Sequence, residues 1–79
     1  MASTEEKVID IISEQLNVDK EKINRETDIA NDLGADSLDI AELMIALEEQ
    51  FDINIDEENA QNVNTVGQVI DHINSALKQ

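Results

Sequence analysis

The chain has 79 residues, with 19 Asp and Glu against five Lys and Arg, which gives a formal net charge of −14. This length predicts a single domain over residues 1–79, and the absence of cysteine excludes a disulfide-stapled scaffold. A surface this acidic repels nucleic acid, anionic membranes and further copies of itself, so we expect a monomer that binds basic patches on proteins.

The first predicted element is an amphipathic helix over Thr4–Leu16, which Ser3 or Thr4 can cap. Its apolar residues recur at the three- and four-residue spacings of one helical face: Val8, Ile9, Ile11, Ile12 and Leu16. From Val18 to Ala35 the apolar residues are too widely spaced for such a face. We therefore expect a long loop there, with a short helical turn around Lys20–Ile23.

The second predicted helix runs from Ser37 to Gln50 or Phe51, and Asp36 can cap it with Asp39 three residues on. One apolar row, predicted to face the core, comprises Ile40, Leu43, Ala46, Leu47 and Phe51. A second row, offset around the helix and mixed with acids, comprises Leu38, Ala41 and Ile45. An apolar row among acids indicates a docking face for a partner, although a helix covered on two sides would show the same pattern.

The last third of the chain predicts one short and one longer helix. Asp52–Asp56 alternates polar with apolar residues and is interpreted as an extended connector. A short third helix is expected over Glu57–Asn62, and Thr65 can cap the last helix. That helix carries a one-faced apolar stripe of Val66, Val69, Ile70, Ile73 and Leu77. The sum is an all-α domain of three longer helices and one short helix around an aliphatic core.

The residues do not indicate an enzyme. A nucleophilic serine needs a nearby base, and the only histidine, His72, is predicted in a different helix from Ser37. There is no glycine-rich phosphate loop, and we expect neither catalytic residues nor a metal site. Ser37 can still serve as an acceptor, because a hydroxyl at a preformed helix start can be modified by another enzyme. From the residues alone, a plain helix-start serine is equally allowed.

The residues around Ser37 carry a family resemblance. Gly34–Asp39, followed by Glu42-Leu43 and Ala46–Phe51, resembles the acyl carrier proteins of type II (dissociated) fatty acid synthesis. The similarity extends over nearly the whole chain, including its length, its acidity, the long first loop and Thr65-Val66 at the start of the last helix. It implies a four-helix bundle, which agrees with the elements predicted above.

The resemblance implies a covalent cofactor. In this family the serine at the position of Ser37 takes 4′-phosphopantetheine from coenzyme A through a phosphodiester bond, with Asp36 and Leu38 beside it. A separate holo-acyl-carrier-protein synthase supplies the magnesium and the general base. The terminal thiol then holds the growing acyl chain as a thioester, so the chain is predicted to be a carrier and not an enzyme.

The resemblance also implies two binding regions. The second helix would meet fatty acid synthesis enzymes and acyltransferases that have basic docking patches. Its predicted contact residues are Asp36, Leu38, Asp39, Ala41, Glu42, Ile45, Glu48 and Glu49. The acyl chain would fold back between the helices into a pocket lined by Leu47, Ile55 and Ile73.

The sequence also leaves two alternative functions open. A carrier for a polyketide, peptide or specialised lipid pathway would share these features, and a non-covalent acidic interaction module would share the charge. The sequence starts without a basic, apolar leader pattern. No stretch approaches the roughly 20 apolar residues of a membrane span. We therefore expect a cytoplasmic protein without stable membrane insertion.

Overall fold

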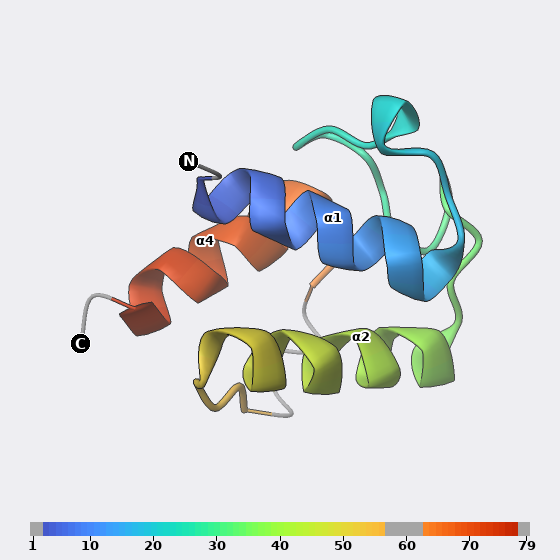
Figure 1. Cartoon of the computed structure of the whole chain (residues 1–79). Helices are drawn as coiled ribbons and strands as arrows, with labels where there is room; N and C mark the ends of the chain where they lie inside the picture. The colour runs from blue at the N-terminus through green and yellow to red at the C-terminus, as the bar shows by residue number, and fades with distance from the viewer. Residues whose placement is uncertain (1–2, 57–62, 78–79) are drawn as a thin grey trace.

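The computed structural model describes residues 3–56 and 63–77, and this part of the chain is helical (Figure 1). Its elements are the helix α1 (Thr4–Leu16), the 3₁₀ turn η1 (Lys20–Lys22), and the helices α2 (Ser37–Phe51) and α4 (Val66–Leu77). These bounds confirm the three longer helices and the short turn after the first of them. The short helix expected at Glu57–Asn62 lies outside the described residues. None of the helices in the two described ranges is long and apolar enough to cross a bilayer.

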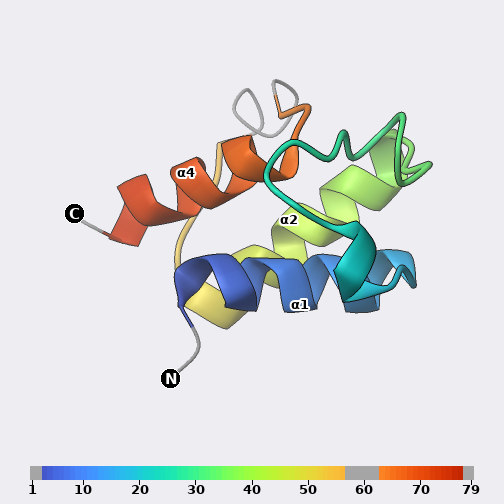
Figure 2. The same ribbon diagram turned by 90° about the horizontal axis from the view of Figure 1, so that it is seen from above.

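The core lies where α1 packs against both α2 and α4 (Figures 1 and 2). Each helix contributes aliphatic side chains to it, and one loop residue joins them. Two of the predicted stripes enter the core only in part: Ile9, Ile11 and Leu16 of α1 are partly buried. Leu77, the last residue of α4, is 45% exposed, so its place in the predicted stripe was wrong. The fully buried side chains are Val8, Ile12, Ile29, Leu43, Leu47, Val66, Val69, Ile70 and Ile73. Burial of these stripes is the main source of helical stability here, because isolated helices of 12 to 15 residues are marginal in water.

The inner face of α2 differs in one respect from the predicted row. Ile40, Ala46 and Phe51 are only partly buried, whereas Met44, which the predicted row omitted, is buried. Met44 lies four residues after Ile40 and three before Leu47, so it is on the same side of the helix. The face that α2 turns to the core is therefore centred on Leu43, Met44 and Leu47.

The long loop is attached to the start of α4 by backbone hydrogen bonds. The amide of Ile29 donates to the carbonyl of Asn64 at 2.9 Å, and the amide of Val66 donates to the carbonyl of Thr27 at 3.0 Å. Together they form an isolated antiparallel bridge between Asp28 and Thr65. Figure 2 shows the loop passing beside the first turn of α4 before it reaches α2. The loop is therefore fixed to the helical core over its second half.

Arg25 extends this attachment to α1. Its carbonyl accepts a hydrogen bond from the amide of Gly67 at 2.9 Å. Its guanidinium donates to Glu5 Oε1 on α1 at 3.0 Å and to Asp71 Oδ1 on α4 at 2.8 Å. Exposed ion pairs of this kind contribute little free energy singly, but here they join three segments at one residue.

Gly67 permits the close approach of the loop to α4. A Cβ atom at this position would lie 2.9 Å from the carbonyl oxygen of Arg25. The cost of a glycine inside a helix, about 1 kcal/mol relative to alanine, is therefore offset by a backbone contact that a larger residue would disrupt.

We predict that Gly67→Ala lowers the free energy of unfolding by about 1–2 kcal/mol, because the clash outweighs the gain in helix propensity. Urea denaturation of the two proteins measures the difference. Ser75→Ala, at an exposed position of the same helix, is the control and should change stability by less than about 0.5 kcal/mol. A more stable Gly67→Ala protein would show that the carbonyl of Arg25 does not lie too close to α4 for a side chain at position 67.

Candidate functional site

The chain approaches Ser37 through a turn fixed at two points. Gly34 has a φ of 72°, in the left-handed region that a side chain rarely adopts. Ala35 is buried, and its amide donates to the carbonyl of Ile29 at 3.2 Å. Because Ile29 is itself bound to the start of α4, the residues just before Ser37 are held against the core.

A second hydrogen-bonded turn precedes this one in the loop. The amide of Asn31 donates to Asp28 Oδ1 at 2.8 Å, and the amide of Asp28 donates to Asp32 Oδ2 at 2.8 Å. The hydrogen bonds from Asn31 hold the pKa of the Asp28 carboxyl below its usual value. These hydrogen bonds thus favour the ionised form of the Asp28 carboxyl, which accepts them within the turn.

Ser37 is the first residue of α2, and its two acidic neighbours form the predicted cap. Asp36 Oδ1 accepts a hydrogen bond from the amide of Asp39 at 2.9 Å, and Asp39 Oδ2 accepts one from the amide of Asp36 at 3.3 Å. This reciprocal capping box satisfies amides that would otherwise lack partners at the start of the helix. Ser37 itself is exposed to solvent. The serine is thus presented outward on a rigid helix start.

The outer face of α2 carries an apolar row that solvent reaches. Leu38 is 66% exposed and Ile45 is 54% exposed, and Ala41 between them is exposed as well. Leu77 is the one other large apolar side chain that is exposed in residues 3–56 and 63–77. The described helices do not cover this row, so of the two interpretations of the pattern, a docking face is the one it favours.

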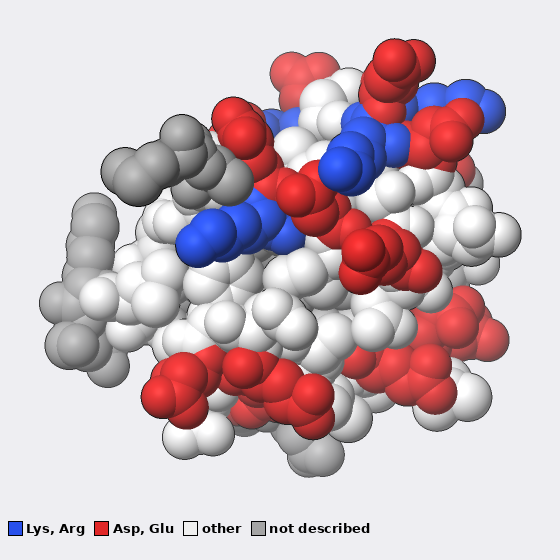
Figure 3. Space-filling model, in the orientation of Figure 1, with Lys and Arg blue, Asp and Glu red and all other residues white. Residues whose placement is uncertain are grey.

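Acidic side chains surround this apolar row. Glu42 and Glu49 are exposed, whereas Asp39 and Glu48 are partly buried. Figure 3 shows carboxylates without Lys or Arg beside them along the lower edge of the molecule, where Figure 1 places α2. The Lys and Arg side chains lie over α1 and the segment after it, among further carboxylates. The face beside Ser37 is therefore both apolar and strongly negative.

The three residues predicted to line an acyl pocket all belong to the hydrophobic core or pack against it. Leu47 and Ile73 are fully buried in the same core cluster, and Ile55 is partly buried and packs against it. They belong to α2, to α4 and to the connector after α2. Their surroundings are almost entirely aliphatic, with Phe51 as the single aromatic residue of the chain.

One contact at the end of α2 was not predicted from the sequence. The amide of Ile55 donates a hydrogen bond to Glu48 Oε2 at 3.0 Å. The two residues are seven positions apart, and the contact depends on the left-handed turn at Asp52, where φ is 54°. The chain leaves the helix at Asp52, between these two residues, so helical periodicity does not place Ile55 beside Glu48 and the sequence carried no signal for the contact.

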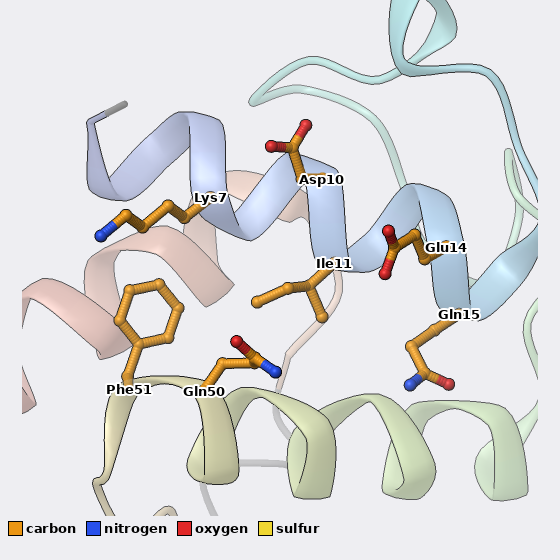
Figure 4. Close-up of a pocket in the computed structure, with 7 residues that line it drawn as sticks. All are labelled: Lys7, Asp10, Ile11, Glu14, Gln15, Gln50 and Phe51. Carbon is orange, nitrogen blue, oxygen red and sulfur yellow. The ribbon is translucent and has the colours of Figure 1, made fainter. Parts of the chain in front are cut away.

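A groove of about 370 Å³ lies between α1 and α2 (Figure 4). Its lining residues are Lys7, Asp10, Ile11, Glu14, Gln15, Gln50 and Phe51. None of these is a predicted site residue, and the groove does not include Ser37. Within the described ranges, no group of three His, Asp or Glu side chains is placed to hold a metal ion.

Several known proteins that are similar to this chain are acyl carrier proteins. A family model described as "Phosphopantetheine attachment site" matches residues 6–73. The acyl carrier protein of Porphyromonas gingivalis is 46% identical over 78 residues, which cover 99% of this chain and 100% of that one. The acyl carrier protein of Syntrophobacter fumaroxidans is 48% identical over 73 residues, with 92% and 90% covered. The crystal structure of an acyl carrier protein from Thermotoga maritima superposes with a TM-score of 0.79 at 29% identity, covering 91% and 84% of the two chains.

We predict that Asp36→Ala lowers the free energy of unfolding by about 1 kcal/mol, because the amide of Asp39 loses its acceptor. Asp36→Asn should retain most of the stability, since its side-chain oxygen can still accept that hydrogen bond. Chemical denaturation of the three proteins tests the cap separately from the charge. Equal losses in both variants would mean that the negative charge, and not the hydrogen bond, stabilises the helix start.

Proposed function

Because the chain belongs to the acyl carrier protein family, whose members carry covalently attached 4′-phosphopantetheine and are carriers and not enzymes, we propose Ser37 as the attachment residue. The observation that carries this proposal is the exposed serine at the capped start of α2, beside the exposed apolar row. When bound, the 4′-phosphopantetheine group supplies the terminal thiol that holds an acyl chain as a thioester.

The surroundings of Ser37 suit a phosphodiester. Its hydroxyl is exposed, and the carboxylates of Asp36 and Asp39 are each bound to the other's amide. The capping box uses the amides of Asp36 and Asp39, so of the amides at this helix start those of Ser37 and Leu38 would face an attached phosphate. With no histidine near it in sequence, Ser37 has no evident base of its own, so a holo-acyl-carrier-protein synthase would have to remove the proton from its hydroxyl.

The outer face of α2 is the proposed docking surface for that synthase and for later partner enzymes. The predicted contacts are Asp36, Leu38, Asp39, Ala41, Glu42, Ile45, Glu48 and Glu49. Leu38, Ala41 and Ile45 offer an apolar strip, and the exposed acids beside it attract Lys and Arg patches. Charges at the rim of such an interface mainly set the association rate and its salt dependence.

Fatty acid synthesis is the pathway we propose, ahead of polyketide, peptide or specialised lipid pathways. Leu47, Ile55 and Ile73 would line the acyl pocket, since they meet in one aliphatic core. Methyl-rich walls can separate around an alkyl chain at lower cost than stacked aromatic rings. Acyltransferases and the enzymes of chain elongation would be the partners.

The proposal also covers the domain organisation, the oligomeric state and the location of the protein. We propose one carrier domain over residues 1–79, present as a monomer in the cytoplasm, because a net charge of −14 opposes self-association. For the whole chain we keep the four-helix bundle as a proposal, because the segment predicted to form its short third helix lies outside the described residues.

The attachment residue can be tested by intact mass. The protein is incubated with coenzyme A, magnesium and a phosphopantetheinyl transferase, and we expect wild type to gain one phosphopantetheine mass. Ser37→Ala should gain none, while Ser75→Ala should be modified like wild type. Circular dichroism of both variants checks that each keeps its helices.

Two results would overturn the proposal. One is a wild-type protein that gains no mass with an active transferase. The other is a folded Ser37→Ala protein that is still modified, because the attachment residue would then lie elsewhere.

We predict that Glu42→Lys lowers the kcat/KM of the phosphopantetheinyl transferase about tenfold at low salt, because it reverses a charge on the docking face. Glu21→Lys makes the same change in net charge on η1, across α1 from α2 in Figure 1, and is the matched control. Denaturation midpoints should be alike for both variants. If the two variants slow the transferase equally, the effect comes from net charge and the α2 face has no special role.

A further inference from the structure

The last turn of α2 and the connector after it are both bound to one residue, Glu48. The amide of Asp52, in the left-handed conformation, donates to the carbonyl of Glu48. The amide of Ile53 donates to the same carbonyl at 3.1 Å. The left-handed turn at Asp52 thereby ends the helix, with both amides bound to the backbone carbonyl of Glu48.

The side chain of Glu48 accepts a further hydrogen bond from the connector. Its Oε2 accepts the amide of Ile55 at 3.0 Å, in a partly buried setting. A hydrogen bond to an ionised acceptor is among the stronger kinds in proteins, and a partly buried amide that loses it pays a desolvation cost. Three hydrogen bonds, from the amides of Asp52, Ile53 and Ile55, therefore end on Glu48. The last of them holds Ile55, whose side chain packs against the core.

The neighbouring acid, Glu49, is placed differently. It is exposed, whereas Glu48 is partly buried, and among the described residues Glu49 makes no hydrogen bond through its side chain. The two residues carry the same charge one position apart on α2. Of the two, Glu48 is the one whose carboxylate accepts a hydrogen bond within the protein.

We propose that Glu48 is a positioning residue, whose carboxylate holds Ile55 in place as a wall of the acyl pocket, and that Glu49 supplies the docking charge at this end of α2. The part concerning the acyl pocket rests on the proposed carrier function. The part concerning the connector rests on the hydrogen bond alone. Release of the Ile55 amide would loosen the wall and expose an acyl chain to solvent.

Two conservative substitutions separate the hydrogen bond from the charge. Glu48→Gln keeps the length of the side chain and an acceptor oxygen but removes the charge. Glu48→Asp keeps the charge but withdraws the acceptor by one methylene. Glu49→Gln and Glu49→Asp are the matched controls, since they repeat the same changes, including the lower helix propensity of aspartate, next to the site.

The first experiment measures hydrogen exchange of the Ile55 amide by NMR in the apo protein. We expect Glu48→Asp to exchange about tenfold faster than wild type, and Glu48→Gln to stay within about threefold. Both Glu49 variants should match wild type, and the Ile70 amide in the core should be unchanged throughout. An Ile55 amide that exchanges alike in wild type and Glu48→Asp overturns the proposal. So does faster exchange in Glu48→Gln than in Glu48→Asp, because charge would then be the property that matters.

The second experiment tests the pocket and the docking charge. The proteins are loaded with an octanoyl thioester from octanoyl-coenzyme A by a phosphopantetheinyl transferase, and the rate of cleavage by hydroxylamine is measured. We expect about threefold faster cleavage in Glu48→Asp than in Glu49→Asp, and a lower loading kcat/KM in Glu49→Gln than in Glu48→Gln. Equal cleavage rates overturn the role of Ile55 in the pocket, and equal loading rates overturn the role of Glu49. A wild-type chain that cannot be loaded defeats the carrier function, and the exchange experiment still decides whether Glu48 positions Ile55.

Discussion

The site depends on the backbone pairing between the long loop and the start of α4. Ile29 takes part twice: its amide is bound to Asn64, and its carbonyl accepts the amide of Ala35. Ala35 is buried next to the Asp36 cap, so this series of bonds runs from the segment before α4 to Ala35, two residues before Ser37. A loop of this length would otherwise sample many conformations, and the serine would have no fixed place relative to the helix that presents it.

The helices could be predicted from the sequence because their signals are local. Apolar spacing predicted Thr4–Leu16 and the stripe of the last helix except for Leu77, which is exposed. Asp36 with Asp39 predicted where α2 begins. The exposed row of Leu38, Ala41 and Ile45 was also evident, because its members follow helical periodicity while lying among acids. Each of these inferences uses residues within a few positions of one another.

The rest of the site could not be predicted from the sequence, because it depends on contacts between residues that are far apart in the chain. The carbonyl of Arg25 reaches Gly67 across more than 40 positions, and it gives a reason for a glycine that helix propensity alone disfavours. Glu48 could be read as one more acid on the outer face of α2, and only the turn at Asp52 brings the Ile55 amide to its side chain. The burial of Met44 is different, because it could have been predicted from the sequence: its spacing from Ile40 and Leu47 places it on the inner side of α2.

The uneven placement of charge along the chain affects how the molecule is oriented when it approaches a charged surface. Every Lys and Arg except Lys78 lies between Lys7 and Arg25, while α2 carries acids and no cation. The molecule therefore has an electric dipole moment as well as a large net charge (Figure 3). A positively charged surface attracts the molecule and also exerts a torque that turns α2 toward that surface during diffusion. Ser37, at the first residue of α2, would then already face the other molecule before any side chains touch.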